Sequence, residues 1–165
     1  VVGFSGSRAS GKSSAGAQKA LAKIMAGENG AVINPDFENL KVSTWPELRE
    51  WIPWEMVVPA HKYRRNPEFD PHQPFTMAFV NGVRVIVKGV KDPDSARGPN
   101  INWLWDDEAQ RDDSGLSWQT AIASVRVGHE PQAWATFTPA GTDHWTYKTF
   151  VKKEIPEEAA KLFEA

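Results

Sequence analysis

The stretch Gly6-Ser7-Arg8-Ala9-Ser10-Gly11-Lys12-Ser13 matches the phosphate-binding pattern G-x-x-x-x-G-K-[ST] at every defined position. It follows an apolar run from Val1 to Phe4 and leads into helix-forming residues from Lys12 to Ala26, which predicts a strand, a loop and a helix in that order. The glycines let the backbone curl and aim its N–H groups at a phosphate, and the positive end of the helix attracts the same anion. We therefore predict a P-loop that binds a nucleotide through these residues and Ser14. A Gly- and Ser-rich turn that only caps a helix is disfavoured, because strand, loop and helix all agree with the motif.

The chemistry of a P-loop gives specific roles to a few further side chains. Lys12 would neutralise the β and γ oxygens of a nucleotide, and the Ser13 hydroxyl would hold Mg²⁺. The run from Ile101 to Glu108 supplies the carboxylate-bearing strand expected beside the P-loop. Asp107 is expected to support Mg²⁺, usually through water, and Glu108 to take the proton of the hydrolytic water. This acidic pair favours an ATPase with a catalytic glutamate that uses ATP and Mg²⁺.

The match at this second strand has two weak points. Asn102 interrupts the apolar run, and Asp106 occupies a position that is normally apolar. We interpret Asp106 as a turn or cap residue rather than as a metal ligand. The alternative for the whole segment is a solvent-facing acidic turn after a buried strand.

The rest of the chain extends this α/β pattern. Asn81-Gly82 supplies the positive φ values of a type I′ turn, so an antiparallel hairpin is predicted near 76–88. The central sheet should otherwise be mainly parallel and flanked by helices, as in the RecA-like class of P-loop folds. The further predicted elements are strands at Ala31–Ile33 and Trp134–Thr138, helices at Trp45–Ile52 and about Trp118–Arg126, and a short helix at the end.

Composition limits the possible classes of protein. The chain has 165 residues, 41% of them hydrophobic and 24% charged, which fits one ordinary globular domain. Its formal net charge of -2 excludes a bulk positive field that would attract nucleic acid, so any DNA contact must be local. There is no cysteine, which excludes disulfides and thiolate metal sites. Because the chain begins without Met and inside a predicted strand, we expect a fragment of a longer protein.

Five motifs in this order resemble the ATPase domain of the large terminase of tailed bacteriophages, over about residues 1 to 150. They are the P-loop with Arg8, the strand end Val32-Ile33-Asn34-Pro35, the Ser95-Ala96-Arg97-Gly98 element, Trp105-Asp106-Asp107-Glu108-Ala109, and Thr136-Phe137-Thr138-Pro139-Ala140-Gly141-Thr142-Asp143-His144-Trp145. The last is similar to the terminase coupling motif.

The resemblance implies a motor that hydrolyses ATP to move double-stranded DNA into a viral capsid. Thr138 would sense the γ-phosphate or link hydrolysis to motion from a strand beside Asp107, and Arg97 resembles the arginine that terminases insert into a neighbouring subunit's site. An exposed loop arginine is the alternative for Arg97. The implied partners are DNA, a homo-oligomeric ring, the portal and the small terminase, with no membrane. The implied location is the cytoplasm of the infected bacterial host, with transient docking on the procapsid.

Residues 1–165 would then be one ATPase core without the lid subdomain or the nuclease domain of a full large terminase. Two other functions stay open. The residues Asp107-Glu108-Ala109-Gln110 also resemble the DEAQ box of a superfamily 2 or PhoH-like helicase core, and a nucleotide-binding assembly module that does not hydrolyse ATP is the third possibility. The basic cluster at His61–Arg65 is a candidate DNA contact or a solvated loop.

Overall fold

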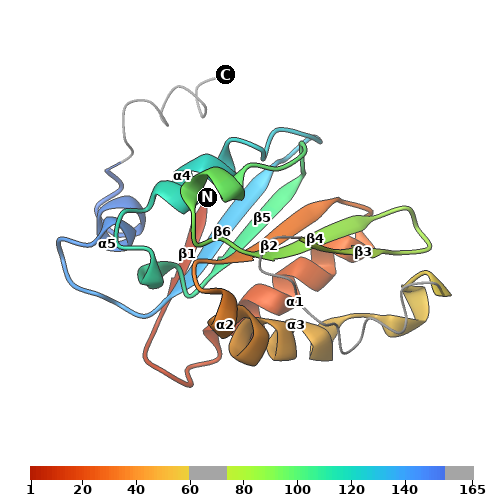
Figure 1. Cartoon of the computed structure of the whole chain (residues 1–165), viewed down its shortest axis with the longest axis horizontal. Helices are drawn as coiled ribbons and strands as arrows, with labels where there is room; N and C mark the ends of the chain where they lie inside the picture. Colours follow the sequence, from red (N-terminus) through yellow and green to blue (C-terminus); the bar gives the residue numbers. More distant parts are fainter. Residues whose placement is uncertain (60–73, 155–165) are drawn as a thin grey trace.

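The computed structural model describes residues 1–59 and 74–154, and within them six strands form one sheet in the order β1-β6-β5-β2-β4-β3 (Figure 1). Five strands are parallel, and β3 pairs antiparallel with β4 at one edge. The strands are β1 (Val2–Ser5), β2 (Gly30–Asn34), β3 (Phe75–Ala78), β4 (Arg84–Gly89), β5 (Trp103–Asp107) and β6 (Gln132–Phe137). The predicted α/β class, with a mainly parallel sheet, is confirmed.

One expectation about strand neighbours is wrong. The strand that carries Asp107 does not lie beside the P-loop strand, because β6 pairs with β1 on one side and with β5 on the other. Crossover connections allow strands distant in sequence to become neighbours, so chain order does not give sheet order. The strand that leads to Thr138 does lie beside Asp107, as predicted.

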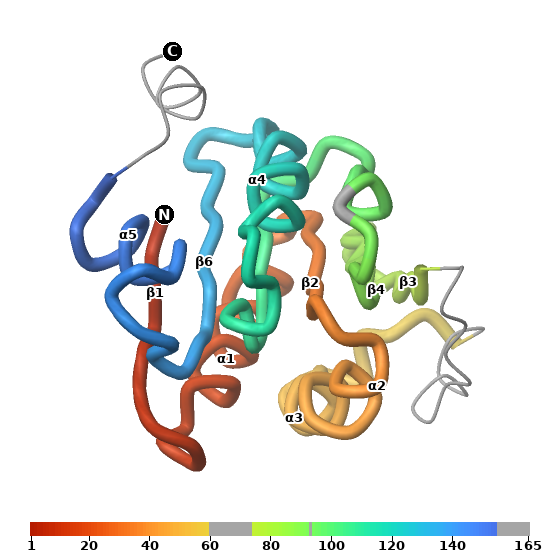
Figure 2. The backbone as a smooth tube through the Cα atoms, turned by 60° about the vertical axis from the view of Figure 1, so that its left-hand side comes forward, coloured from red at the N-terminus to blue at the C-terminus, as the bar shows by residue number. Residues whose placement is uncertain are grey.

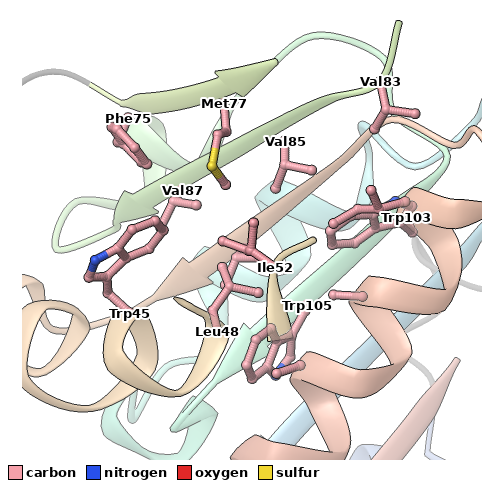
Figure 3. Packing of buried hydrophobic residues seen from close by; sticks show 14 of the residues in the cluster. Trp45, Leu48, Ile52, Phe75, Met77, Val83, Val85, Val87, Trp103 and Trp105 are labelled. Carbon is pink, nitrogen blue, oxygen red and sulfur yellow. The ribbon is translucent and has the colours of Figure 1, made fainter. Parts of the chain in front are cut away.

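Helices cover both faces of the sheet (Figures 1 and 2). One face carries α1 (Lys12–Met25) and α3 (Trp45–Trp51), and Figure 3 shows their packing against Trp103, Trp105 and the valines of β4. Gly16 permits this contact, since a Cβ there would lie 2.5 Å from the ring of Trp105. Helix α1 can therefore approach closely enough to bring its first turn to the end of β5.

The opposite face carries α4 (Leu116–Ile122) and a 3-10 turn, η4 (Pro93–Ala96). Trp118 and Ala121 of α4 pack there on Leu104, Ala135 and Phe137. Because neighbouring residues of a strand point to opposite faces, Leu104 and Asp106 belong to this side, and Trp105 and Asp107 to the side of α1.

The helix before Pro53 is longer than predicted. Helix α2 (Phe37–Asn39) and a π-helical turn, η1 (Leu40–Thr44), precede α3. The predicted helix at Trp118–Arg126 instead ends at Ile122, because Val125 forms a parallel bridge with Ile101 and takes the backbone out of the helix. Beyond these, 3-10 turns lie at η2 (Trp54–Met56) and η5 (Ala109–Arg111), and α5 (Trp145–Phe150) is the final helix described.

The hairpin is present, but its turn is not type I′. Phe79 N donates to Val83 O (2.9 Å), which leaves a three-residue loop in which Gly82 has a positive φ of 88° and Asn81 does not. The Asn81 side chain instead accepts from Val83 N and donates to Ile24 O, which fixes this residue against the end of α1. The basic cluster at 61–65 lies outside the described residues. Within residues 1–59 and 74–154, no helix is long and apolar enough to span a membrane.

Candidate active site

The candidate site lies at the carboxyl edge of the sheet, where parallel strands deliver their ends to one place. The P-loop leaves β1 there, Glu108 follows β5, and Thr138 follows β6. In Figure 2 the P-loop (red) and α2 (orange) both leave the lower edge of the sheet. A pocket of about 710 Å³ opens at this edge, within the size range of small-molecule sites. The predicted residues that line it are Arg8, Ala9, Ser10, Gly11, Lys12, Ser13, Ser14, Glu108 and Thr138.

The P-loop backbone is curled by residues in the left-handed region. Gly11 has φ 78°, and Ala9 has φ 58°, a conformation that residues with a side chain rarely adopt. Gly6 N donates to Phe137 O (3.3 Å), which joins the start of the loop to β6. The Lys12 ammonium donates to the carbonyl of Ser7 (2.7 Å), so it bends back over the loop that it closes.

Asp107 lies behind the pocket and is fully buried. Its Oδ1 accepts hydrogen bonds from Ser13 (2.9 Å) and Thr136 (2.6 Å), and its Oδ2 accepts one from Thr44 (2.6 Å). Burial raises the pKa of Asp107, and the three hydroxyl donors oppose that rise. The structure therefore brings together the two side chains predicted to support Mg²⁺, Ser13 and Asp107.

Further bonds fix the donors of Asp107. Trp105 Nε1 donates to Thr136 Oγ1 (2.8 Å), and Asn34 Nδ2 donates to Thr44 Oγ1 (2.8 Å). Thr44 ends the π-helical turn η1, a rare geometry that is frequent at functional sites. Residues of three strands, of η1 and of the first turn of α1 thus hold a single carboxylate.

The interpretation of Asp106 as a turn or cap residue is wrong. Asp106 lies within β5, has 0% exposure, and neither carboxyl oxygen has a hydrogen-bond partner among the described residues. Burial, followed by the charges of Asp107 and Asp112, raises the pKa of Asp106 well above its ordinary value. The alternative of a solvent-facing acidic turn is wrong for the same reason, because both aspartates are strand residues without solvent contact.

Glu108 is the first residue after β5, and its backbone is left-handed (φ 57°, ψ 38°). Its Oε2 accepts a hydrogen bond from Gln110 Nε2 (2.5 Å) and lies 3.8 Å from Arg111 Nε. Arg111 also pairs with Asp36, from Nη1 to Oδ2 (3.1 Å). The carboxylate of Glu108 thus faces the pocket from a fixed position.

The remaining predicted site residues differ in whether they line the pocket. Thr138 N donates to Gln110 Oε1 (3.0 Å) at the pocket wall. Gly6 and Ser7 belong to the loop without lining the pocket. Arg97 lies outside the pocket lining, with a side chain that is 79% exposed and 3.5 Å from Asp94.

The oxygen donors at Ser13 and Asp107 are of the kind that Mg²⁺ prefers. Among the described residues, no three His, Cys, Asp or Glu side chains gather so as to hold a metal by themselves. This donor set suits an ion that takes most of its ligands from water and from substrate phosphates, as Mg²⁺ does at P-loops.

Sequence reasoning missed several residues of the site: Thr44, Thr136, Gln110 and Arg111. Thr136 had a signal, because it precedes Thr138 by two residues and so shares its side of the strand. Gln110 and Arg111 directly follow the acidic pair. Thr44 had no signal, since its position depends on the π-helical turn and on the contact with β5.

Known proteins share the sequence pattern and the fold of this chain. A model of the phage terminase large subunit family matches residues 2–163. The ATPase domain of the Thermus phage P74-26 large terminase is similar in structure, with TM-score 0.61 and 22% identity over 90% of this chain and 62% of that chain. The large terminase from another thermophilic bacteriophage, in complex with ATP-gamma-S, gives TM-score 0.64 and 14% identity over 99% of this chain and 43% of that chain. The ADP complex of that second terminase gives TM-score 0.61 and 15% identity over 99% of this chain and 44% of that chain.

The chain spans less than two thirds of the length of these structures. No curated protein matches the sequence. The structural likeness shows the fold, and the family model covers nearly the whole sequence. The chain belongs to the phage terminase large subunit family.

Proposed function

We propose that this chain is the ATPase core of a DNA-packaging motor, which hydrolyses ATP to move double-stranded DNA into a viral capsid. The observation that carries the proposal is that the P-loop and Glu108 line one pocket at the carboxyl edge of the sheet, and that Asp107 accepts a hydrogen bond from Ser13 behind it. The family match favours this motor over the helicase alternative. The complexes of the thermophilic bacteriophage terminase with ATP-gamma-S and ADP support a nucleotide as the ligand of the pocket.

Binding of ATP would use the P-loop from Gly6 to Ser14. Its backbone N–H groups and the N-terminus of the 14-residue helix α1 would hold the phosphates. Lys12 would exchange the Ser7 carbonyl for the β and γ oxygens, which need positive charge most. Arg8, exposed at the mouth of the pocket, would add a second cation.

Hydrolysis would depend on Glu108. A water oxygen attacks the γ-phosphorus, the bond to the bridging oxygen breaks, and ADP leaves with that electron pair. The proton of the water passes to the Glu108 carboxylate, which lines the pocket. Thr138, which follows the neighbouring β6 and lines the same pocket, would sense whether the γ-phosphate is present.

Mg²⁺ would be held by Ser13 directly and by Asp107, usually through water. When bound, it neutralises charge on the β and γ phosphate oxygens. The contribution of this chain is to hold the Asp107 carboxylate beside Ser13, and the hydroxyls of Thr44 and Thr136 fix it there and oppose the rise in its pKa that burial causes.

The proposal extends to assembly and partners, on the basis of the family match. Residues 1–165 would act as one core within a ring, in which Arg97 reaches the pocket of a neighbouring subunit. Its exposure and its position outside its own pocket are compatible with action in trans. Duplex DNA, the portal and the small terminase would be the partners, in the cytoplasm of the bacterial host and at the procapsid.

The test compares phosphate release by the wild-type chain and by Glu108→Gln at saturating ATP, with duplex DNA and at high protein concentration. We expect Glu108→Gln to lower kcat by about 10²- to 10⁴-fold, the usual contribution of a general base, with little change in ATP affinity. Glu130→Gln, at an exposed position away from the pocket, is the matched control. ATP binding without phosphate release by either protein would contradict the proposal.

A second assay distinguishes a motor from a helicase. A duplex translocase should displace a triplex-forming strand from duplex DNA in the presence of ATP, and should leave the two duplex strands paired. Separation of the duplex strands without triplex displacement would favour the helicase alternative.

A further inference from the structure

The side chain of Gln110 joins the ends of two neighbouring strands through both ends of its amide. Its Nε2 donates to Glu108 Oε2 (2.5 Å), and its Oε1 accepts from the backbone N of Thr138 (3.0 Å). A side-chain amide offers both a hydrogen-bond donor and an acceptor without carrying a charge. Gln110 therefore connects a carboxylate after β5 to the backbone after β6.

The two carboxyl oxygens of Glu108 differ in their contacts. Its Oε2 meets Gln110 and, at longer range, Arg111, whose guanidinium is itself paired with Asp36. Among the described residues, no hydrogen bond is made to Oε1 of Glu108. One carboxyl oxygen is thus held, and the other is left for a ligand in the pocket.

The backbone at Glu108 adds a second, independent observation. Its φ of 57° is unfavourable for a residue with a side chain, and such strain persists only where the surroundings enforce it. It turns the chain at the end of β5 so that Gln110 returns toward β6. Strained backbone of this kind is concentrated at functional sites.

We propose that Gln110 is a positioning residue for hydrolysis, which holds Oε2 of Glu108 so that Oε1 faces the attacking water. This rests on the proposed ATPase function. Because the other end of the amide is fixed by Thr138, movement of the turn after β6 would shift Glu108 through Gln110. A glutamate without this bond has three free side-chain torsions, and misplacement by about 1 Å can cost roughly 10²-fold in rate.

A purely structural role fits the contacts less well. Gln110 is only partly buried, and it is not a member of either hydrophobic cluster. Both of its partners line the candidate pocket. Loss of its amide should therefore change catalysis more than it changes folding.

The test uses two substitutions with different effects on the two bonds. Gln110→Met keeps the length of the side chain and removes both bonds, whereas Gln110→Glu keeps an acceptor for Thr138 N and removes the donor to Glu108. Gln119→Met, at an exposed position of α4, is the matched control. The readouts are kcat and KM for ATP, the melting temperature, and hydrogen exchange of the Thr138 amide by NMR.

We expect both Gln110 variants to lower kcat by about 10²-fold, with KM and melting temperature close to wild type. Exchange at the Thr138 amide should accelerate by about tenfold in Gln110→Met and stay slow in Gln110→Glu. In a Glu108→Gln background, Gln110→Met should have little further effect on residual hydrolysis, because residues that act as a unit are not additive.

Three results would overturn the positioning role. The first is a wild-type kcat in either Gln110 variant while the wild-type chain hydrolyses ATP. The second is a loss of kcat that is accompanied by a clear drop in melting temperature. The third is full additivity of the effects of Gln110→Met and Glu108→Gln on kcat. A wild-type chain that binds ATP without hydrolysing it would overturn the proposed function and the positioning role together.

Discussion

Asp106 and Asp107 are consecutive residues of β5, both completely buried, and they have opposite surroundings. Asp107 faces α1 and accepts hydrogen bonds from three hydroxyl groups, of Ser13, Thr44 and Thr136. Asp106 faces the side of α4, and its oxygens have no partner in residues 1–59 and 74–154. The alternation of side chains along the strand separates them.

The difference shows how a buried carboxylate becomes part of a site. Burial opposes ionisation at both positions, but donors can offset this cost only at Asp107. Hydrogen bonds therefore offset part of the cost of the charged form on the side of the P-loop, and none of it on the side of α4. The hydrogen-bond partners of Asp107, more than its position in the sequence motif, favour it over Asp106 as the carboxylate that supports the metal.

The largest expected effect concerns hydrolysis by variants at the two aspartates. Asp107→Asn should lower the rate of phosphate release by about 10²-fold, the range seen when a group that supports a metal is replaced. Asp106→Asn, the matched substitution one residue earlier, should leave turnover close to wild type. Steady-state phosphate release at saturating ATP and Mg²⁺ measures both, and equal losses would remove the distinction between the two sides of the strand.

A smaller effect is expected on stability when one donor to Asp107 is removed. Thr136→Val keeps the shape of the side chain, but it deprives Asp107 of a donor and Trp105 Nε1 of its acceptor. A buried group left unsatisfied costs roughly 1–3 kcal/mol of unfolding free energy. Thr120→Val in α4 is the control, and urea unfolding of both variants makes the measurement. A Thr136→Val protein as stable as the control would show that the hydroxyl network contributes nothing.

The smallest effect is a pH dependence of stability at Asp106. Because the folded protein raises the pKa of this carboxyl, the unfolded chain loses the proton first, and stability falls as pH rises from about 4 through the folded value. Asp106→Asn removes this contribution, so the variant should gain stability relative to wild type as pH rises from 4 to 8. Urea unfolding across this range tests it, and a variant that gains no stability relative to wild type would contradict the account of an unsupported charge at Asp106.

Much of the fold follows from local sequence. The P-loop pattern, the helix after it and the strand ending in the acidic pair are local features, and each lies where the sequence predicts it. The predicted type I′ turn is wrong because Asn81 bonds to Ile24 of α1, a contact between segments far apart in the chain.

The site was less accessible to sequence reasoning. Ser13 and Asp107 belong to motifs with known chemistry, so their types and spacing were enough to pair them. Thr44 and Gln110 act through contacts set by the strand order and by a π-helical turn, which no local pattern reports. The burial of Asp106 was missed for a similar reason, because an acidic residue in a strand interior contradicts ordinary composition.

The central claim is that the pocket between the P-loop and Glu108 holds the triphosphate, with its metal on the Asp107 side of β5. A crystal structure of the chain with a non-hydrolysable ATP analogue and Mn²⁺ tests it most directly, because anomalous scattering locates the metal. The account predicts the γ-phosphate near Lys12 and Glu108, and Mn²⁺ beside Ser13 with Asp107 in contact directly or through one water. Mn²⁺ on Asp106, or an analogue bound away from the P-loop, would contradict it.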